Sequence, residues 1–345
     1  MTKRGAAIAI FIGVFGCSGF LGDDPGDDPV TVFEDFWENF DRYYAHFELK
    51  EIDWYDVYHQ YRPLVSEETT EDELFDLFTE MIRLLEDGHV YLVGGERRAL
   101  SDGHLRNGRR NFDPSILKET YLPGLKKIGE EKIHFGRIRD QNIGYLRLST
   151  LAGGDGRGDE VQGWITELEH AIQELKDTQG LILDLRSNGG GRAYNTKYVA
   201  SFFAKSRQPF VVTRSRNGPR YSDFSAPRTW YAGPENAPIL YEKPVVVLTN
   251  RFSFSAAEWL TLALRQYEHI THIGTNSGGG LAMFLPRELP NGWTYTISVQ
   301  DTRTPLGQSL ERVGIEPHFF VEISEKDLLE RRDSMIERAI EILSQ

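Results

Sequence analysis

The chain has one cysteine, Cys17, among its 345 residues. An internal disulfide is therefore impossible, and stability has to come from buried apolar surface. Positive charge is also scarce, with 39 Lys and Arg against 52 Asp and Glu, and no basic run offsets the acidic balance. This argues against nucleic-acid binding through phosphate groups. Apolar residues make up 40% of the chain, an ordinary value for one large or two small globular domains.

The apolar run nearest the N-terminus is short. Residues 6–15 follow Lys3 and Arg4, are too few to cross a membrane, and predict a secretory signal peptide over residues 1–16. The sequence Val-Phe-Gly before Cys17 resembles a bacterial lipobox, which implies that Cys17 becomes a lipidated N-terminus. A signal anchor, or plain secretion with an incidental cysteine, is the alternative. The expected location is the bacterial cell envelope, either on a membrane through a lipid anchor or secreted.

Helices are predicted for the next part of the chain. Residues 17–30 are rich in Gly, Asp and Pro and predict a flexible tether. Capping residues then indicate three helix starts, at Thr31, Asp53 and Thr70. Apolar and aromatic side chains recur at helical spacing behind each start. Residues 31–86 are therefore expected to form a helical subdomain, followed by a catalytic domain over residues 87–345.

Strands and helices alternate in the larger part of the chain. The expected order is strand 143–148, helix 161–176, strand 180–185, helix 194–204, strand 245–248 and helix 255–266, with a last helix over 326–343. This alternation predicts an α/β fold.

A serine lies where a buried strand is expected to meet a helix. The apolar run at residues 245–248 leads through polar turn residues to Ser255, where an amphipathic stretch begins. Ser255 and Glu258 also form a Ser-x-x-Glu capping box, so a purely structural N-cap is one interpretation.

A second segment favours chemistry at that serine. At residues 180–191 another apolar strand runs into Asp184, Arg186, Asn188 and three consecutive glycines. Glycines directly after a buried strand let the backbone approach a ligand and point its N–H groups outward. A nucleophile at one strand end and an oxyanion hole at another form the arrangement that acyl transfer needs.

Together the two segments resemble the carboxyl-terminal processing peptidase superfamily, which includes the tricorn core protease. That family has a D-x-R-x-N-x-G-G strand end and a nucleophilic serine in a [ST]-x-S-A-[SA]-E turn, which here is SFSAAE. The resemblance implies that Ser255 is the nucleophile and that the amides of Ala256 and of Gly189 or Gly190 hold the oxyanion. It also implies a crotonase-like ββα-superhelix core behind the N-terminal helical subdomain.

The lysine base of the bacterial processing proteases is missing. Gly280 stands where that lysine is expected, and residues 244–325 contain no lysine. A serine hydroxyl needs a neighbouring base, and histidine is the usual substitute. The tricorn-like branch carries its base in a D-x-H turn, which resembles the Asp-Gly-His sequence ending at His89, although Gly88 replaces a serine of the family. This implies His89 as the base, and an incidental histidine beside a turn is the alternative.

The third member of the expected triad comes from the C-terminal part. The tricorn-like family places an orienting glutamate in a V-E-N-x-G-V-x-P-D segment, and residues 310–318 are similar, with the sequence LERVGIEPH. The resemblance implies that Glu311 orients His89. Arg312 and His318 depart from the pattern of the family, and a charge in solvent or a partner for Arg312 is the alternative for Glu311.

Substrate selection is expected within the catalytic domain. About fifty residues separate the strands expected at 89–93 and 143–148, too few for the peptide-binding PDZ domain usual in the processing proteases. The glycines expected to let an extended peptide pass are Gly278, Gly279 and Gly280. The candidate pocket residues are Phe252, Phe254 and Trp259, for which core packing is the alternative.

The resemblance therefore implies a serine endopeptidase that hydrolyses extracytoplasmic peptides or unfolded proteins through Ser255, His89 and Glu311. No cofactor, metal or nucleic-acid partner is expected. Two alternatives stay open at this point, a non-catalytic module that binds hydrophobic ligands or peptides and an esterase that uses the same triad.

Overall fold

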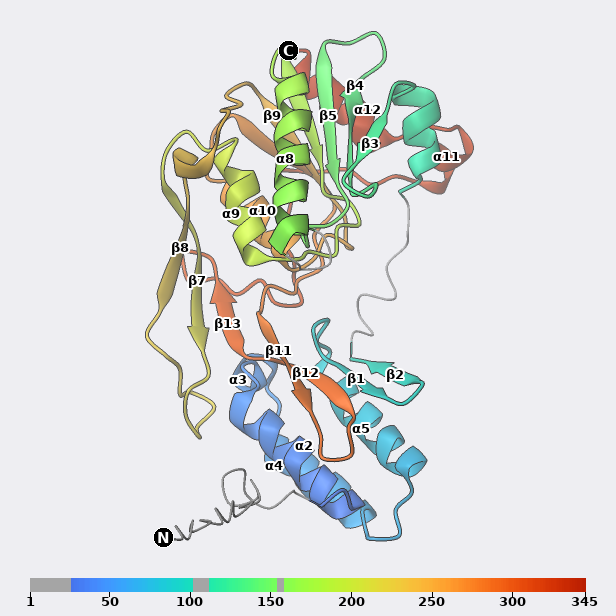
Figure 1. The fold of residues 1–345 in the computed structure, drawn as a ribbon, viewed down its shortest axis with the longest axis vertical. Coiled ribbons are helices and arrows are strands. Elements are labelled where there is room, and N and C mark those ends of the chain that lie inside the picture. Colours follow the sequence, from blue (N-terminus) through green and yellow to red (C-terminus); the bar gives the residue numbers. More distant parts are fainter. Residues whose placement is uncertain (1–25, 102–111, 154–157) are drawn as a thin grey trace, which may run out of the picture.

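Two lobes are stacked along the long axis of the molecule (Figure 1). The computed structural model describes residues 26–101, 112–153 and 158–345. We call the upper part, built on a seven-stranded sheet, the core lobe, and the lower part, built on a four-stranded sheet, the helical lobe. The expected signal peptide and Cys17 lie outside the described residues. Within those ranges, none of the helices has the length and apolarity needed to span a membrane.

The helical lobe packs helices on an antiparallel sheet. Its helices are α2 Pro29–Tyr43, α3 Phe47–Lys50, α4 Trp54–Tyr61 and α5 Glu71–Leu85, with the 3₁₀ turn η1 Arg62–Leu64. Its strands, in spatial order, are β11 Phe284–Glu288, β12 Thr294–Ser298, β1 Tyr91–Gly94 and β2 Arg97–Leu100. Two of these strands come from late in the sequence, so the subdomain expected over residues 31–86 is completed by distant segments.

The start of α2 differs from the expected start. Thr31 was expected to cap this helix, but the cap is Asp28, whose Oδ1 accepts hydrogen bonds from the N–H groups of Val30 (3.1 Å) and Thr31 (3.0 Å). Pro29 occupies the first helical position, where its missing N–H has no consequence. The caps expected at Asp53 and Thr70 are confirmed.

Aromatic rings form the centre of the helical lobe. Phe36 of α2 stacks on Phe78 of α5 with the ring centroids 4.0 Å apart and the planes 8° from parallel. It also contacts Tyr295 of β12, at 5.3 Å. All three residues are buried. The hydrophobic core therefore joins the N-terminal helices to the late hairpin.

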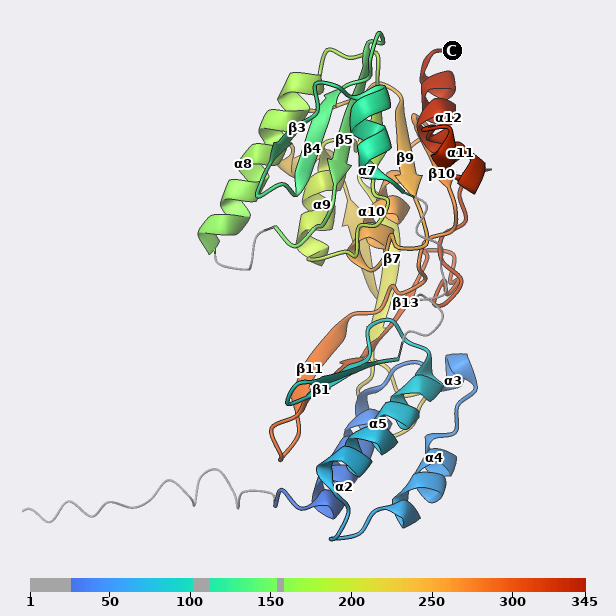
Figure 2. The same cartoon turned by 90° about the vertical axis from the view of Figure 1, so that its right-hand side faces the viewer.

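The core lobe has three layers. Its sheet, in spatial order, contains β14 Phe319–Phe320, β10 Ile270–Gly274, β9 Val245–Thr249, β6 Gly180–Asp184, β5 Ile143–Leu148, β4 Ile133–Arg137 and β3 Lys126–Ile128. One face is covered by α8 Gly158–Leu175, α9 Ala193–Ser201 and α10 Ala256–Leu264 (Figure 2). The other face is covered by α7 Pro114–Ile116, the π-helical turn η2 Leu117–Tyr121, α11 Glu325–Leu329 and α12 Ser334–Leu343.

Burial on both faces explains the uninterrupted apolar strands. Every residue of β6 and β9 is buried, as expected for parallel strands between two helical layers. Leu181 and Leu183 pack in the cluster with α8 and α10, while Ile182 packs in the cluster with α12. The α/β alternation predicted from the sequence is confirmed.

The last expected helix is interrupted. Residues 326–343 were expected to form one helix, but α11 and α12 are separate. Asp333 caps α12 by accepting hydrogen bonds from the N–H groups of Met335 and Ile336, each at 3.1 Å. Arg331 before it has a φ of 55°, which breaks the helical path.

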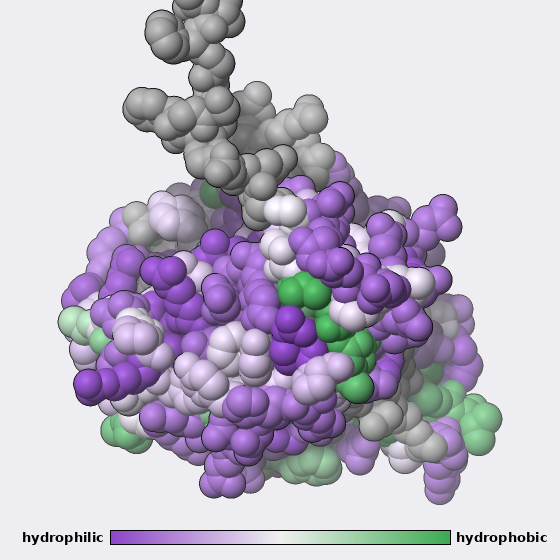
Figure 3. Space-filling model, turned by 90° about the horizontal axis from the view of Figure 1, so that it is seen from below, coloured by the Kyte–Doolittle hydropathy of each residue, from purple (hydrophilic) through white to green (hydrophobic). Residues whose placement is uncertain are grey.

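A third sheet extends across the boundary between the lobes at one side of the molecule (Figure 1). Its strands, in spatial order, are β13 Gln300–Arg303, β7 Gln208–Ser215 and β8 Arg228–Ala232, and the 3₁₀ turn η3 Pro234–Asn236 follows. Seen from below, the molecule is mostly hydrophilic, with a narrow apolar strip near the centre of this face and further apolar patches at its rim (Figure 3).

We expect Phe36→Ala to lower the free energy of unfolding by about 3–5 kcal/mol, because it removes a ring packed between α5 and β12. The control Leu64→Ala, at a side chain that is 60% exposed, is expected to change it by less than about 0.5 kcal/mol. Urea unfolding measures both values. Equal effects would contradict the packing of the late hairpin on the N-terminal helices.

Candidate active site

Ser255 lies in a strained turn between β9 and α10. Its φ of 57° and ψ of −122° are unfavourable for a residue with a side chain. The turn is anchored on both sides: Ser253 Oγ donates to Leu185 O (2.7 Å), and Phe254 N donates to Asn188 O (2.9 Å). These bonds tie the end of β9 to the end of β6, and they project Ser255 from the core lobe toward the helical lobe.

The glycine segment after β6 lies directly against this turn. Gly190 has a φ of 97°, and a Cβ there would lie 2.7 Å from Ser255 Cβ and 2.8 Å from Phe254 O. Its N–H donates to Asn188 Oδ1 at 2.8 Å. Gly190 was expected to supply an oxyanion donor, but its amide is already used, and the close approach of the two segments explains the glycine instead. Gly189 is exposed and has open space around its Cα.

His89 approaches Ser255 from the helical lobe. It lies in the turn between α5 and β1, where its N–H donates to Asp87 Oδ1 (2.9 Å). Its Nε2 lies 3.0 Å from Ser255 Oγ. The ring is 5% exposed and packs between Phe254 and Phe284, with centroid distances of 4.7 and 5.1 Å. This burial lowers the pKa of His89 to about 4, so the imidazole is neutral at physiological pH.

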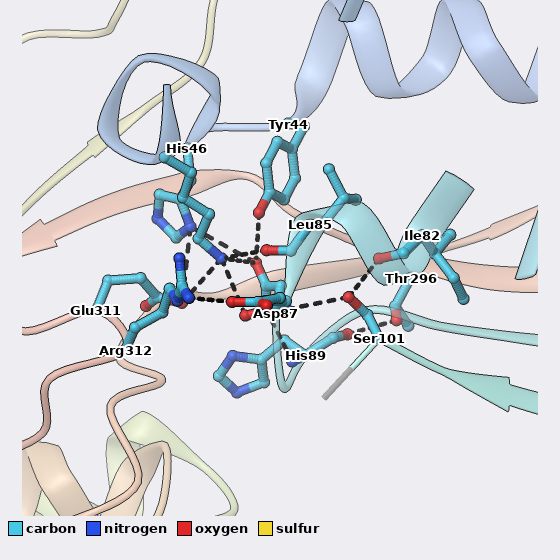
Figure 4. A network of polar contacts seen from close by, with 12 residues as sticks. Tyr44, His46, Ile82, Leu85, Asp87, His89, Ser101, Thr296, Glu311 and Arg312 are labelled. Atoms are coloured by element: carbon cyan, nitrogen blue, oxygen red, sulfur yellow. Dashed lines mark hydrogen bonds and ion pairs between the residues drawn. The ribbon is translucent and has the colours of Figure 1, made fainter. Parts of the chain in front are cut away.

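Glu311 lies in a neighbouring cluster rather than on His89 (Figure 4). Its Oε1 is 3.7 Å from Lys50 Nζ and 3.8 Å from His46 Nδ1. Among the described residues, the buried Nδ1 of His89 has no hydrogen-bond partner. The sequence therefore placed Ser255 and His89 correctly beside each other, whereas the direct contact expected between Glu311 and His89 is not formed.

A buried carboxylate, that of Glu258, organises the nucleophile turn. Its Oε2 accepts hydrogen bonds from Ser255 N–H and Gly280 N–H, both at 2.9 Å, and its Oε1 accepts from Gly279 N–H (2.8 Å) and Ser277 Oγ (2.6 Å). Burial raises the pKa of Glu258 to about 7, although these donors act in the opposite direction. The sequence indicated only a capping box here, and the links to residues 277–280 depend on the tertiary fold.

The glycines at 278–280 are structural. They were expected to border a passing peptide, but all three are buried, and Gly278 N–H donates to Ser253 O at 2.9 Å while the other two donate to Glu258. A Cβ on Gly280 would lie 2.0 Å from Phe254 Cζ. Their N–H groups are thus occupied, which corrects the expectation of a substrate-binding glycine loop.

A pocket of about 180 Å³ opens beside Ser255. Its walls are formed by Gly191, Arg192, Ala193, Ser255, Ala256, Trp259, Leu281, Ala282, Met283 and Phe284. Trp259, a candidate pocket residue, is confirmed in the lining, and its Nε1 donates to Leu281 O at 2.9 Å. Phe254 packs on His89 instead, and Phe252 does not line this pocket. The surface next to Ser255 is mainly apolar.

Two protein-family models match the chain. The model of peptidase family S41 matches residues 142–321, which include Ser255, and the model of the Tricorn protease C1 domain matches residues 25–83.

Similar proteins carry related descriptions. The chain is 26% identical over 203 residues to the carboxy-terminal processing protease CtpB of Bacillus subtilis, covering 58% of this chain and 38% of that protein. It is 29% identical over 210 residues to the carboxyl-terminal-processing protease of Synechocystis, covering 59% of this chain and 44% of that protein. The chain thus spans less than half the length of these two relatives.

One solved structure is similar over nearly the whole chain. The crystal structure of a protein of Parabacteroides merdae, described as a candidate peptidase, is 30% identical, with a TM-score of 0.82. The alignment covers 92% of this chain and 97% of that chain.

We expect Gly190→Ala to lower the free energy of unfolding by about 1–3 kcal/mol, because a Cβ would collide with the Ser255 turn at an unfavourable φ. Gly189→Ala is the matched control, since its Cβ meets open space, and a change below about 0.5 kcal/mol is expected. Urea unfolding of both variants measures the difference. Similar values would contradict the close packing of Gly190 on the turn.

Proposed function

This chain belongs to peptidase family S41, a family of serine peptidases, and we propose that it cleaves peptide bonds with Ser255 as the nucleophile and His89 as the general base. One observation carries the proposal, the 3.0 Å separation of Ser255 Oγ and His89 Nε2 across the lobe boundary. A neutral imidazole at this distance accepts the hydroxyl proton as the serine attacks. The buried ring favours the neutral form that this step requires.

The proposed reaction proceeds through an acyl-enzyme. Ser255 Oγ attacks the carbonyl carbon of the scissile bond while its proton passes to His89 Nε2. The same proton then goes to the leaving amine, and a water molecule activated by His89 hydrolyses the ester.

The oxyanion of the intermediate needs hydrogen-bond donors close to Ser255. We assign this role to the N–H groups of Ala256 and Gly189. Ala256 is the first residue of α10, where helical N–H groups lack partners within the helix, and Gly189 lies exposed beside the turn. Loss of one such donor typically costs about 10²–10³ in rate.

The proposed substrate is an extended peptide or unfolded protein. The lining of the 180 Å³ pocket supports an apolar side chain next to the scissile bond. Cleavage of extracytoplasmic polypeptides by an enzyme anchored through Cys17, and the crotonase-like classification of the core, stay predictions from the sequence. The processing activity named for the relatives in Bacillus subtilis and Synechocystis is consistent with this substrate class.

We expect a fluorophosphonate probe to label the folded protein at Ser255 and not to label Ser255→Ala, because only an activated serine reacts. Ser206→Ala, at an exposed serine, is the control and should label like the wild type. Mass spectrometry identifies the labelled residue. Absence of labelling in the folded wild type would contradict the proposal and favour a non-catalytic binding module.

Digestion of a denatured protein mixture separates a peptidase from an esterase. New C-termini that end in apolar residues are expected with the wild type and not with Ser255→Ala. Probe labelling without new termini would favour an esterase.

We expect the titration of His89 to leave the labelling rate unchanged from neutral pH down to about pH 5 and to lower it around pH 4 and below, because protonation of His89 removes the base. The charged groups that face His89 are Asp87, His46 and Lys50. The pH dependence is measured by labelling the protein at a series of pH values and stopping the reaction at fixed times.

Glu258 is a second group whose titration can change the labelling rate, and its effect has to be distinguished from that of His89. Glu258, with a pKa of about 7, contacts the Ser255 turn, so a change near pH 7 that disappears in Glu258→Gln belongs to Glu258. A fall near pH 6.5 that persists in Glu258→Gln would contradict the buried, neutral state of His89.

A further inference from the structure

A buried charge cluster surrounds Asp87 in the turn that carries His89 (Figure 4). It combines Lys50 and His46 from the α3 region with Asp87 from the His89 turn and Glu311 from the segment after β13. The side chains of all four are between 0% and 5% exposed. Charges at such depth need partners, so their arrangement is expected to be specific.

Lys50 is the central member of this cluster. Its Nζ donates to Leu85 O (2.9 Å) and lies 3.6 Å from Asp87 Oδ2 and 3.7 Å from Glu311 Oε1. The bond to Leu85 places a positive charge at the C-terminal end of α5, where the helix dipole favours it. One ammonium group therefore contacts the helix before the His89 turn, the turn itself and a segment from the other side of the boundary.

The Asp87 side connects Lys50 to His89. Asp87 Oδ2 accepts a hydrogen bond from Tyr44 Oη (3.0 Å), and Oδ1 accepts the bond from His89 N–H. Although burial acts in the opposite direction, the Lys50 and His46 charges hold the pKa of Asp87 well below its usual range. Asp87 is thus an ionised acceptor that fixes the turn bearing the imidazole.

The Glu311 side connects Lys50 to Ser255. Arg312, the next residue, donates its N–H to Gly279 O at 2.7 Å, and Gly279 N–H in turn binds Glu258. Glu258 accepts the Ser255 N–H. Polar contacts and short backbone links therefore run from His89 through Asp87, Lys50, Glu311 and Glu258 to Ser255.

We propose that Lys50 is a positioning residue for the Ser255–His89 pair. Its ammonium group binds the carboxylates of Asp87 and Glu311 from the two sides of the lobe boundary and thereby sets the distance between imidazole and hydroxyl. Glu311 acts on His89 through Lys50 in this arrangement. The inference rests on the proposed function, because it assigns how that pair is held.

An ammonium explains the cluster better than a metal ion. Ligand atoms of His46, Asp87 and Glu311 lie within 4.8 Å of one another, a spacing that a divalent cation would accept. Lys50 Nζ, however, already lies close to both carboxylates, and a second cation would be repelled by it.

The test is the rate of fluorophosphonate labelling of Ser255 in the full chain as a function of pH. Lys50→Met keeps most of the stem and removes the charge. We expect it to slow labelling at neutral pH by about 10- to 100-fold, because the base is no longer held in place. The fall of the labelling rate at low pH, called the acid limb below, is expected to move to higher pH in Lys50→Met, because the Lys50 charge disfavours protonation of His89.

Asp87→Asn is expected to shift the acid limb in the opposite direction. The asparagine keeps an oxygen for the His89 N–H, and loss of the negative charge is expected to move the acid limb to lower pH. Lys50→Arg keeps the charge and should restore part of the rate. Lys326→Met, at an exposed lysine of α11, is the matched control and should leave rate and limb unchanged.

The outcomes separate the two proposals. If the wild type is not labelled at Ser255, the proposed function fails. If the wild type is labelled and folded Lys50→Met has the same rate and limb, the positioning role alone is overturned. Should Lys50→Met fail to fold in a thermal unfolding assay, an unchanged labelling rate at neutral pH in folded Asp87→Asn overturns it instead, because that variant removes the carboxylate through which Lys50 contacts the His89 turn.

Discussion

The carboxylate of Glu258 holds two segments that would otherwise be independent. It accepts four hydrogen bonds, from the Ser255 turn on one side and from Ser277, Gly279 and Gly280 on the other. A fully buried carboxylate is costly when its acceptor capacity is unmet, so displacing either segment is opposed by the loss of bonds to the other. The strained φ of Ser255 persists because this network, together with the packing of Gly190, leaves the turn no relaxed alternative.

Ser255 and His89 belong to different lobes. The packing at the boundary between the lobes therefore sets the distance between the hydroxyl and the imidazole. Ser255 is fixed by the ends of the parallel strands β6 and β9 of the core lobe, whereas His89 is fixed by the end of α5 and by Asp87. The hydroxyl and the imidazole meet at 3.0 Å only when both lobes are in register. Aromatic packing of Phe254 from one lobe and Phe284 at the start of β11 against the same ring excludes water there. The same aromatic contacts thus align the two lobes and shield the His89 ring from water.

The sequence predicted the two turns of the site that carry Ser255 and His89. The strand–turn–helix around Ser255 and the turn before β1 are encoded in a few neighbouring residues, so both were found. The burial of residues 278–280 and the pairing of Glu311 with Lys50 depend on segments that are far apart in the sequence. The bond from Gly190 N–H to Asn188 Oδ1 is local, but no motif in the sequence marks it. Lys50 had no motif to mark it. The start of α2 was missed for another reason, since Asp28 and Thr31 are both good caps, and Pro29 at the first helical position is the local signal that favours Asp28.

The glycine at position 280 and the proposed histidine base are sterically linked through Phe254. The resemblance to the processing proteases places their lysine at position 280, where this chain has glycine. A Cβ at Gly280 would lie 2.0 Å from the ring of Phe254, so no side chain fits there while that ring keeps its place. The same ring packs against His89 at 4.7 Å and shields it from water. Restoring a lysine at 280 would displace Phe254 and remove the support of the imidazole, so the two bases exclude each other in this framework. In this chain the ring of Phe254 therefore supports the proposed base His89 and leaves no room for a side chain at position 280.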